Sequence, residues 1–209
     1  MKQPHRADSL RCAPQGQVTW PVLGLHSWLT VLALVYVLLG VPALHAQNAK
    51  PTDYDVKAAY LYNFGRFVEW PAEVTAAQSG HFTVCVLGQD PFGPSLDTTL
   101  AGETIGGKSI VAKRISNPQE SDDCRILFLS PTEGGHLKKI VAELDKKAVL
   151  TVSDIPQFAQ LGGMIQFVLE GKRVRFEVNL AATQRAGLTL SSELLKVATT
   201  VRKNSTSGD

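Results

Sequence analysis

One segment of this 209-residue chain has the residue types and spacing of a nucleotide-binding loop. Residues 102–109, with the sequence GETIGGKS, match the P-loop pattern G-x-x-x-x-G-K-S/T. A P-loop needs a buried strand before the glycines and a helix that begins at the Lys-Ser pair, so that backbone N–H groups surround the phosphates. Here the preceding residues look helical, and residues 110–115 are largely β-branched and strand-like. We therefore predict a turn followed by a strand.

Other catalytic and metal-binding patterns are weaker still. After residue 46 the chain has two histidines, His81 and His136, each in a polar setting and without the spacing of metal ligands. Asp122 and Asp123 are consecutive, so their side chains point apart. There is no G-x-S-x-G and no H-E-x-x-H motif. We predict no catalytic residue, no metal site and no cofactor.

Two cysteines, Cys85 and Cys124, lie in apolar runs that are typical of buried strands. If these strands are neighbours, a disulfide would close a loop of about 40 residues and stabilise the fold by about 4 kcal/mol. The alternative is a pair of buried, unreactive thiols, because the sequence does not place the two Cα atoms at bonding distance. Neither cysteine begins a helix and there is no C-x-x-C motif, which argues against a catalytic thiol.

The N-terminal segment predicts export. An uncharged apolar run, Leu29–Val41, follows three basic residues and precedes Pro42 and a small residue, Ala46. This order is typical of a secretory signal peptide over residues 1–46, with cleavage after Ala46. An uncleaved membrane anchor is the alternative, since the apolar stretch that begins at Val18 could just cross a bilayer.

Charge excludes some classes of partner. The segment before Gln47 holds three of the 21 basic and one of the 19 acidic residues, so the remainder carries 18 of each. A neutral mature chain is not expected to bind nucleic acid or acidic lipid through a charge surplus. Its length of about 160 residues fits a single domain, residues 47–202, and the polar residues 203–209 are expected to form a disordered tail.

Strands and helices are expected to alternate along this domain. A helix capped by Asp53 or Asp55 should run to about Glu69, where Trp70-Pro71 ends it. The further elements are strand 82–87, helix 95–100, strands 109–115 and 124–129, helix 135–144, strand 148–152, hairpin strands 164–169 and 174–178, and a helix over 191–201 capped by Ser191 or Ser192. This order predicts a three-layer α/β fold, with a mostly parallel sheet, helices on both faces, and a C-terminal β-hairpin plus helix.

The first helix has an aromatic apolar stripe. At about 100° per residue the stripe comprises Val56, Tyr60, Leu61, Phe64, Phe67 and Val68. On the other side, Tyr62 and Arg66 are expected to be exposed recognition residues, since both types are favoured at interfaces. Near the hairpin, Arg173 and Arg175 are expected to contact an anion or a partner. Alternatively, they protect an edge strand from unwanted pairing.

Two loops after strands could bind a small ligand. Residues 89–93 and 132–136 follow the strands that contain the two cysteines. In α/β folds, small ligands bind at the carboxyl ends of parallel strands. The alternative is that both are ordinary strand-to-helix connections.

Five segments, in order along the chain, resemble the YfiR-like family. They are VKAAYLYNFGRFVEWP (56–71), FTVCVLG (82–88), CRILFLS (124–130), VRFEVNL (174–180) and AGLTLSSELL (186–195). The resemblance implies a periplasmic, non-enzymatic α/β regulator that forms a homodimer. It also implies that this regulator represses an inner-membrane diguanylate cyclase by binding its periplasmic part, and that redox or envelope stress relieves the repression.

The resemblance also bears on the cysteines and on the alternatives. It implies a Cys85–Cys124 disulfide, whereas the second cysteine pair of some members has no counterpart here. A periplasmic small-ligand-binding accessory of another envelope receptor or sensor kinase is the main alternative, and an unrecognised enzyme is a third. Contact with the membrane is expected only through the N-terminal segment, if it is not cleaved.

Overall fold

The computed structural model describes residues 50–72 and 80–203. The predicted signal peptide or anchor, and residues 204–209 of the predicted tail, lie outside the described residues. Within the described ranges no helix has the length and apolar character needed to cross a membrane.

Strands and helices alternate along the described chain. The strands are β1 (Val68–Glu69), β2 (His81–Leu87), β3 (Thr104–Ile105), β4 (Lys108–Ile115), β5 (Cys124–Leu129), β6 (Leu150–Ser153), β7 (Ile165–Glu170), β8 (Arg173–Asn179), β9 (Thr189–Leu190) and β10 (Thr200–Arg202). The helices are α2 (Asp53–Phe67), α4 (Pro94–Leu100), α5 (Leu137–Leu144), α6 (Leu180–Arg185) and α7 (Ser192–Val197), with 3-10 helices η1 (Pro118–Asp123) and η2 (Pro131–His136).

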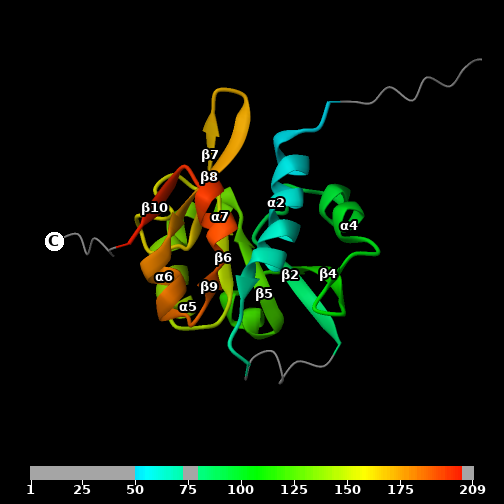
Figure 1. Cartoon of the computed structure of the whole chain (residues 1–209), viewed down its shortest axis with the longest axis horizontal. Helices are drawn as coiled ribbons and strands as arrows, with labels where there is room; N and C mark the ends of the chain where they lie inside the picture. Colours follow the sequence, from blue (N-terminus) through cyan, green and yellow to red (C-terminus); the bar gives the residue numbers. More distant parts are fainter. Residues whose placement is uncertain (1–49, 73–79, 204–209) are drawn as a thin grey trace, which may run out of the picture. The chain divides into compact units, whose positions relative to one another are not determined.

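An eight-stranded, mostly parallel sheet organises these elements (Figure 1). Its strand order is β10-β8-β7-β6-β5-β2-β4-β3. The pairs β7–β8 and β3–β4 are antiparallel, and the other neighbouring pairs are parallel. β1 and β9 form a separate antiparallel pair. The prediction of a mixed α/β fold with a mostly parallel sheet is confirmed.

Apolar side chains of the central strands form two core clusters. In β5, Ile126 and Phe128 belong to one cluster, whereas Leu127 and Leu129 belong to the other, because successive side chains of a strand point to opposite faces. Helices α2 and α4 contribute side chains to the first cluster and α5 to the second.

Helix α2 begins at a capping box. The Thr52 hydroxyl accepts the N–H of Asp55 at 3.2 Å, and the Asp55 carboxylate accepts the N–H of Thr52 at 2.7 Å. The prediction that Asp53 or Asp55 is the cap was wrong, because Asp55 reaches back from the third helical position. The helix also ends at Phe67, earlier than predicted, because Val68 takes an extended conformation and pairs with β9.

The buried side of α2 differs from the predicted apolar stripe. The buried residues of the helix are Lys57, Ala58, Leu61, Phe64 and Gly65. Phe67 is 36% exposed, which corrects the prediction, and it is the last residue before the helix gives way to β1. Val56 and Tyr60 are only partly buried, because they face a hollow beside the hairpin that is described below.

The C-terminal helix is shorter than predicted. α7 begins after Ser191, whose hydroxyl accepts the N–H of Leu194 at 3.2 Å. It ends at Val197, because Ala198 is extended and the chain continues into β10. The following β-branched residues, 199–201, favour this strand over a further helical turn. Helix α6, whose cap is Asn179, was not predicted.

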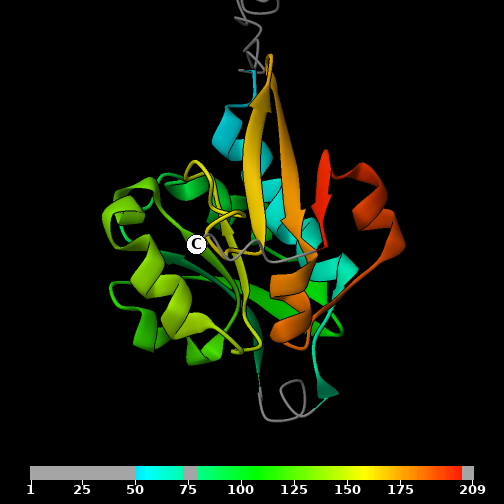
Figure 2. The ribbon, with the colours of Figure 1, turned by 90° about the vertical axis from the view of Figure 1, so that its left-hand side faces the viewer.

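β7 and β8 pair over their whole length, from Ile165 opposite Val178 to Glu170 opposite Arg173. Gly171 and Lys172 join them in a two-residue turn, and the positive φ of Gly171, 63°, suits such a turn. Figure 2 shows this pair of strands rising beyond the rest of the sheet, next to the beginning of α2. We call it the hairpin arm.

Candidate partner-binding site

The segment that matches the P-loop pattern is a tight turn between antiparallel strands. Thr104 of β3 lies opposite Ser109 of β4. Between them, Gly106 and Gly107 have positive φ angles of 57° and 77°, as a two-residue hairpin turn requires. A strand and not a helix follows. The predicted turn and strand are confirmed, and the segment lacks the strand–loop–helix geometry of a phosphate-binding loop.

Cys85 and Cys124 form a disulfide between the neighbouring strands β2 and β5, with 5.7 Å between their Cα atoms. Both side chains are completely buried in the second core cluster. This is the pairing that the family resemblance implies. Because the sulfur atoms are covered by apolar neighbours, the bridge is inaccessible to solvent in the folded state and acts as part of the core.

The two strand-end loops pack against each other. The N–H of Gln89 donates to the Thr132 hydroxyl at 3.2 Å, and a side chain at Gly88 would meet the Glu133 carboxylate. The two loops therefore contact each other at their first residues. A hollow of about 390 Å³ lies beside the second loop and is lined by Gly134, Gly135, His136, Leu137, Lys138, Lys139 and Leu161.

Arg66 is exposed on the outer side of α2, whereas Tyr62 is half-buried against the first core cluster and so less exposed than predicted. The Arg66 guanidinium carbon is 5.7 Å from the centroid of the Tyr62 ring and 6.0 Å from that of Phe67. The Tyr62 hydroxyl donates to the Glu103 carboxylate at 2.7 Å, and this hydrogen bond raises the pKa of Tyr62. The structure thus groups the two predicted recognition residues with an exposed phenylalanine, at the side of α2 that faces the loop before β3.

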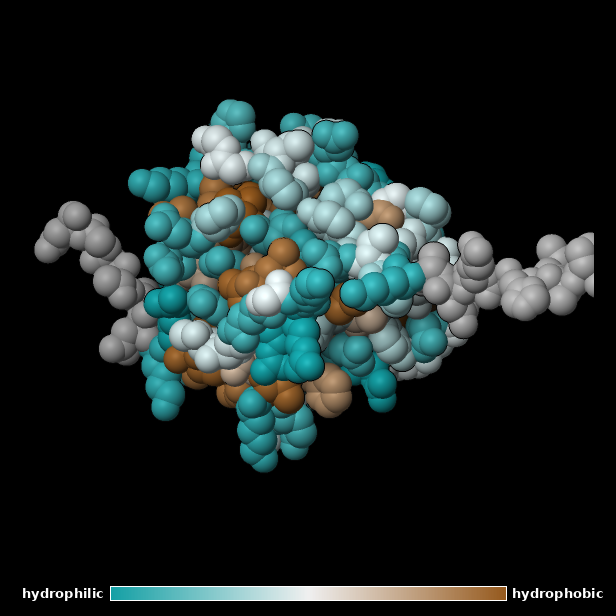
Figure 3. All heavy atoms as spheres, turned by 90° about the horizontal axis from the view of Figure 1, so that it is seen from above, coloured by the Kyte–Doolittle hydropathy of each residue, from teal (hydrophilic) through white to brown (hydrophobic). Residues whose placement is uncertain are grey.

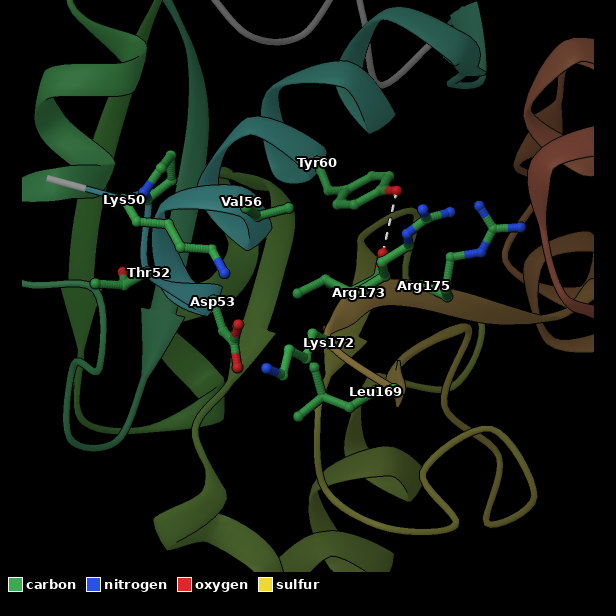
Figure 4. A pocket seen from close by; sticks show the side chains of 12 residues that line it. Lys50, Thr52, Asp53, Val56, Tyr60, Leu169, Lys172, Arg173 and Arg175 are labelled. Carbon is green, nitrogen blue, oxygen red and sulfur yellow. Dashed lines mark hydrogen bonds between the residues drawn. The ribbon is translucent and has the colours of Figure 1, made fainter. Parts of the chain in front are cut away.

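Arg173 and Arg175 belong to a different surface, near the tip of the hairpin arm. A hollow of about 660 Å³ lies between the arm and the first turns of α2 (Figure 4). It is lined by Lys50, Pro51, Thr52, Asp53, Val56, Tyr60, Leu169, Gly171, Lys172, Arg173, Val174 and Arg175. We call it the hairpin hollow. Four of these side chains are cationic and one is a carboxylate, so the hollow favours an anionic occupant.

The hairpin hollow also has an apolar part. Leu169 is 57% exposed, an unusual fraction for a leucine on a strand, and it lies opposite the buried Val174. Tyr60 reaches from α2 to the arm, where its hydroxyl donates to the Val174 carbonyl at 3.4 Å. Figure 3 views the end of the molecule that carries the arm and shows apolar groups set among polar ones. The hollow is also lined by Tyr60, Arg173 and Arg175, residue types that are enriched at protein interfaces.

Arg173 and Arg175 also border the other side of the arm, which they share with Glu170 and Val168. Arg173, Arg175 and Glu170 line a second, smaller hollow of about 340 Å³. Arg175 Nε lies 4.0 Å from the Glu170 carboxylate, and the two side chains are 44% and 58% exposed. An exposed pair at this distance contributes little to stability, so these arginines are available for an external carboxylate or phosphate.

A comparison with known families covers most of this architecture. A family model described as YfiR/HmsC-like matches residues 54–199, from the first turn of α2 to the residue before β10. The chain belongs to the YfiR/HmsC-like family. The family suspected from the five sequence segments is thereby confirmed.

Within this YfiR/HmsC-like fold, a buried polar cluster holds α2 in place. The Tyr54 hydroxyl donates to the Asp154 carboxylate at 2.9 Å, and Lys57 Nζ lies 4.0 Å from the centroid of the Tyr54 ring. Burial, together with the hydrogen bond to Asp154, raises the pKa of Tyr54 to about 12. The cluster ties the start of α2, and hence one wall of the hairpin hollow, to the end of β6.

Several residues of the YfiR/HmsC-like site were missed from the sequence. Lys50 and Tyr60 line the hairpin hollow, although the first stands outside any predicted element and the second was assigned to the core. Leu169 was assigned to a strand without a role. Lys57 gave a usable signal, since a lysine between apolar helical positions predicts either a snorkelling side chain or a buried ion pair.

Both histidines of the described part of this YfiR/HmsC-like chain, His81 and His136, are exposed. Across residues 50–72 and 80–203, no three His, Cys, Asp or Glu side chains are grouped as metal ligands. The His81 ring nitrogen lies 2.7 Å from the Ser109 hydroxyl at the surface, and His136 is exposed at the end of η2.

Proposed function

We propose that this protein is a periplasmic regulator that represses an inner-membrane diguanylate cyclase by binding the periplasmic sensor part of the cyclase. The single observation that carries the proposal is the match of residues 54–199 to the YfiR/HmsC-like family. In this proposal residues 1–46 direct export, residues 47–202 form one domain with helices over both faces of the sheet, and the mature protein is a homodimer that lowers cyclic-di-GMP signalling.

Repression requires that the regulator bind one conformation of its partner better than another. A protein with equal affinity for the active and inactive forms of the cyclase does not change the equilibrium between them. Two surfaces are available for such contacts, the Tyr62–Arg66 side of α2 and the hairpin arm with Arg173 and Arg175. Both present tyrosine and arginine, which dominate the binding energy of many interfaces.

The test of this proposal is genetic. Deletion of the gene should raise intracellular cyclic-di-GMP, and expression of the full-length protein should restore the original level. A control chain that lacks residues 1–46 should fail to restore it, because it would stay on the wrong side of the membrane. An unchanged cyclic-di-GMP level after deletion would contradict the proposal.

A second candidate function is supported by the size of the hairpin hollow. Its volume of about 660 Å³ falls within the range of small-molecule pockets. The protein would then be a periplasmic ligand-binding accessory of another envelope receptor or sensor kinase. Thermal melting of the purified protein against a panel of small carboxylates would test this, since a ligand of the folded state raises the Tm. An unchanged Tm throughout the panel would count against it.

A further inference from the structure

The outer edge of β8 is covered only in part by the strands that the structure describes. β10 pairs with residues 177–179 of β8, whereas β8 begins at Arg173. No strand of the described chain pairs with residues 173–175 on this side, and the Phe176 carbonyl already accepts the N–H and the hydroxyl of Thr199. Figure 2 shows the hairpin arm continuing beyond the level of β10 and α7. Part of an otherwise interior strand is therefore open at one edge.

The backbone of β8 presents hydrogen-bonding groups to that edge. Asn179 donates to Met164 at 2.8 Å, so its N–H faces β7, and the direction of these groups alternates along a strand. The backbone N–H and C=O of Phe176 therefore point away from β7, and the Phe176 carbonyl accepts the Thr199 N–H at 2.9 Å. The backbone N–H and C=O of Val174, two residues earlier, point to the same side. Its carbonyl accepts the long bond from Tyr60 and has a second lone pair for another donor.

The two faces of the arm would lie beside alternate side chains of an added strand. Val174 and the exposed Leu169 are on the apolar side, next to Tyr60. Arg173 and Arg175 are on the polar side. Because side chains alternate between faces along a strand, an extended segment at this edge would place every second residue beside the arginines and the residues between beside the apolar side chains.

Charge decides which segment fits. A second copy of the arm would bring its own arginines and Lys172 against the same groups, and like charges on neighbouring strands are destabilising. A segment with acidic residues at alternate positions would form charge-assisted hydrogen bonds instead. The same cations thus disfavour self-pairing and favour an acidic partner.

We infer that the open edge of β8 binds an extended segment of a partner protein, in which acidic and apolar residues alternate, by adding it to the sheet as a further strand. The inference rests on the proposed function in one respect, that the protein acts through a protein partner. It adds the mode of binding and the chemistry of the partner segment. Main-chain hydrogen bonds to Val174 would supply affinity, and Arg173 and Arg175 would supply selectivity.

The test uses fluorescein-labelled peptides of alternating glutamate and valine, and protein purified after export of the full chain. Fluorescence anisotropy should show saturable binding of the parent peptide. Two further peptides carry N-methyl groups on all the valines or on all the glutamates. An added strand directs only one of these two sets of N–H groups toward β8, so one methylated peptide should lose binding and the other should retain it.

Charge variants complete the test. Arg173→Glu with Arg175→Glu should weaken binding at least about tenfold, whereas Lys138→Glu with Lys139→Glu, the same charge change on α5, should change it less than about twofold. Arg173→Gln with Arg175→Gln repeats the first measurement with a smaller perturbation, and circular dichroism checks the fold of each variant.

Strand addition is overturned by absence of saturable binding, by equal effects of the two methylated peptides, or by equal losses in the two double variants. These outcomes are separate from those of the proposed function. If deletion raises cyclic-di-GMP but the peptides do not bind, only the strand addition fails. If the peptides bind as described but deletion leaves cyclic-di-GMP unchanged, only the proposed function fails.

Discussion

The ammonium group of Lys57 lies 2.5 Å from the carboxylate of Asp154, with 7% and 14% of the two side chains exposed. The residues are 97 positions apart in the sequence. Their ion pair therefore fixes the first turns of α2 against the end of β6. Since Val56 and Tyr60 on the same helix line the hairpin hollow, this pair also determines the shape of the candidate site.

Removal of one member of this pair should destabilise the fold. In Lys57→Met the Asp154 carboxylate stays in place, and its Oδ1 atom is already buried without a hydrogen-bond partner among the described residues. We expect the free energy of unfolding to fall by about 2–4 kcal/mol, because an uncompensated charge would remain buried. Urea denaturation measures this change.

A double variant and a surface control sharpen that measurement. Lys57→Met with Asp154→Leu removes both charges and should recover much of the loss. Lys139→Met breaks an exposed pair with Glu143, which should change the stability by less than about 0.5 kcal/mol. Equal effects of Lys57→Met and Lys139→Met would contradict the role assigned to the buried pair.

The raised pKa of Tyr54 predicts a loss of stability at high pH. Its value in the folded state is about 12, against an ordinary value of 10.0, so folding favours the neutral phenol. The contribution of Tyr54 to the free energy of unfolding is fully present below about pH 10 and is lost as the pH rises toward about 12. In Tyr54→Phe the corresponding part of the decline should be absent. Urea denaturation of both proteins across this pH range tests the difference, and parallel curves would refute it.

Much of the sheet was predictable because its strands are short apolar runs with clear ends. The strand containing Cys124 was predicted with the bounds of β5. It is buried on both faces, so its sequence is a continuous apolar run with clear ends and no alternation of polar and apolar residues. The two-residue strands β1, β3 and β9 were missed. Their pairing depends on residues far away in the sequence, such as Val68 with Leu190, and no local pattern encodes it.

The candidate site was only partly accessible from the sequence. Arg173 and Arg175 stood out as charges near a predicted turn, but the hairpin hollow needs the start of α2 beside them. Tyr60 was assigned to the core because the 100° periodicity shows which side of a helix is apolar, and it does not show where the sheet beneath that helix ends. The position of the hollow is a tertiary property.

The disulfide should contribute strongly to stability. Cys85 and Cys124 are 39 positions apart, and closing a loop of that size stabilises the fold by about 4 kcal/mol. Reduced protein and the variant Cys85→Ala with Cys124→Ala should both unfold at lower urea concentration than the oxidised protein. Addition of reductant to the double variant should have no effect. Two titratable thiols in the denatured, oxidised protein would contradict the bridge.

Gly163 should not tolerate a side chain. A Cβ atom at this position would lie 2.2–2.4 Å from ring atoms of Phe158, which is fully buried. Gly163→Ala is therefore expected to lower the free energy of unfolding by about 1–3 kcal/mol through overpacking. Gly135 has nothing within 4 Å of a built Cβ atom, so Gly135→Ala is the matched control and should stay within about 0.5 kcal/mol. Equal melting temperatures for the two variants would show that the ring of Phe158 moves aside.

The outer side of α2 should matter for repression more than for folding. Tyr62→Ala with Arg66→Ala removes an exposed hydrogen bond to Glu103 and a cation–π contact, together worth about 1 kcal/mol. It also removes the packing of the half-buried Tyr62 ring against the first core cluster, so circular dichroism must show that the variant is folded. Cells that carry this variant should show raised cyclic-di-GMP, close to the level after deletion, because interface tyrosine and arginine carry a large share of binding energy. Glu103→Ala keeps both recognition side chains and controls for the lost hydrogen bond. Normal repression by the double variant would place the partner elsewhere, and the hairpin arm would then be the remaining surface to test.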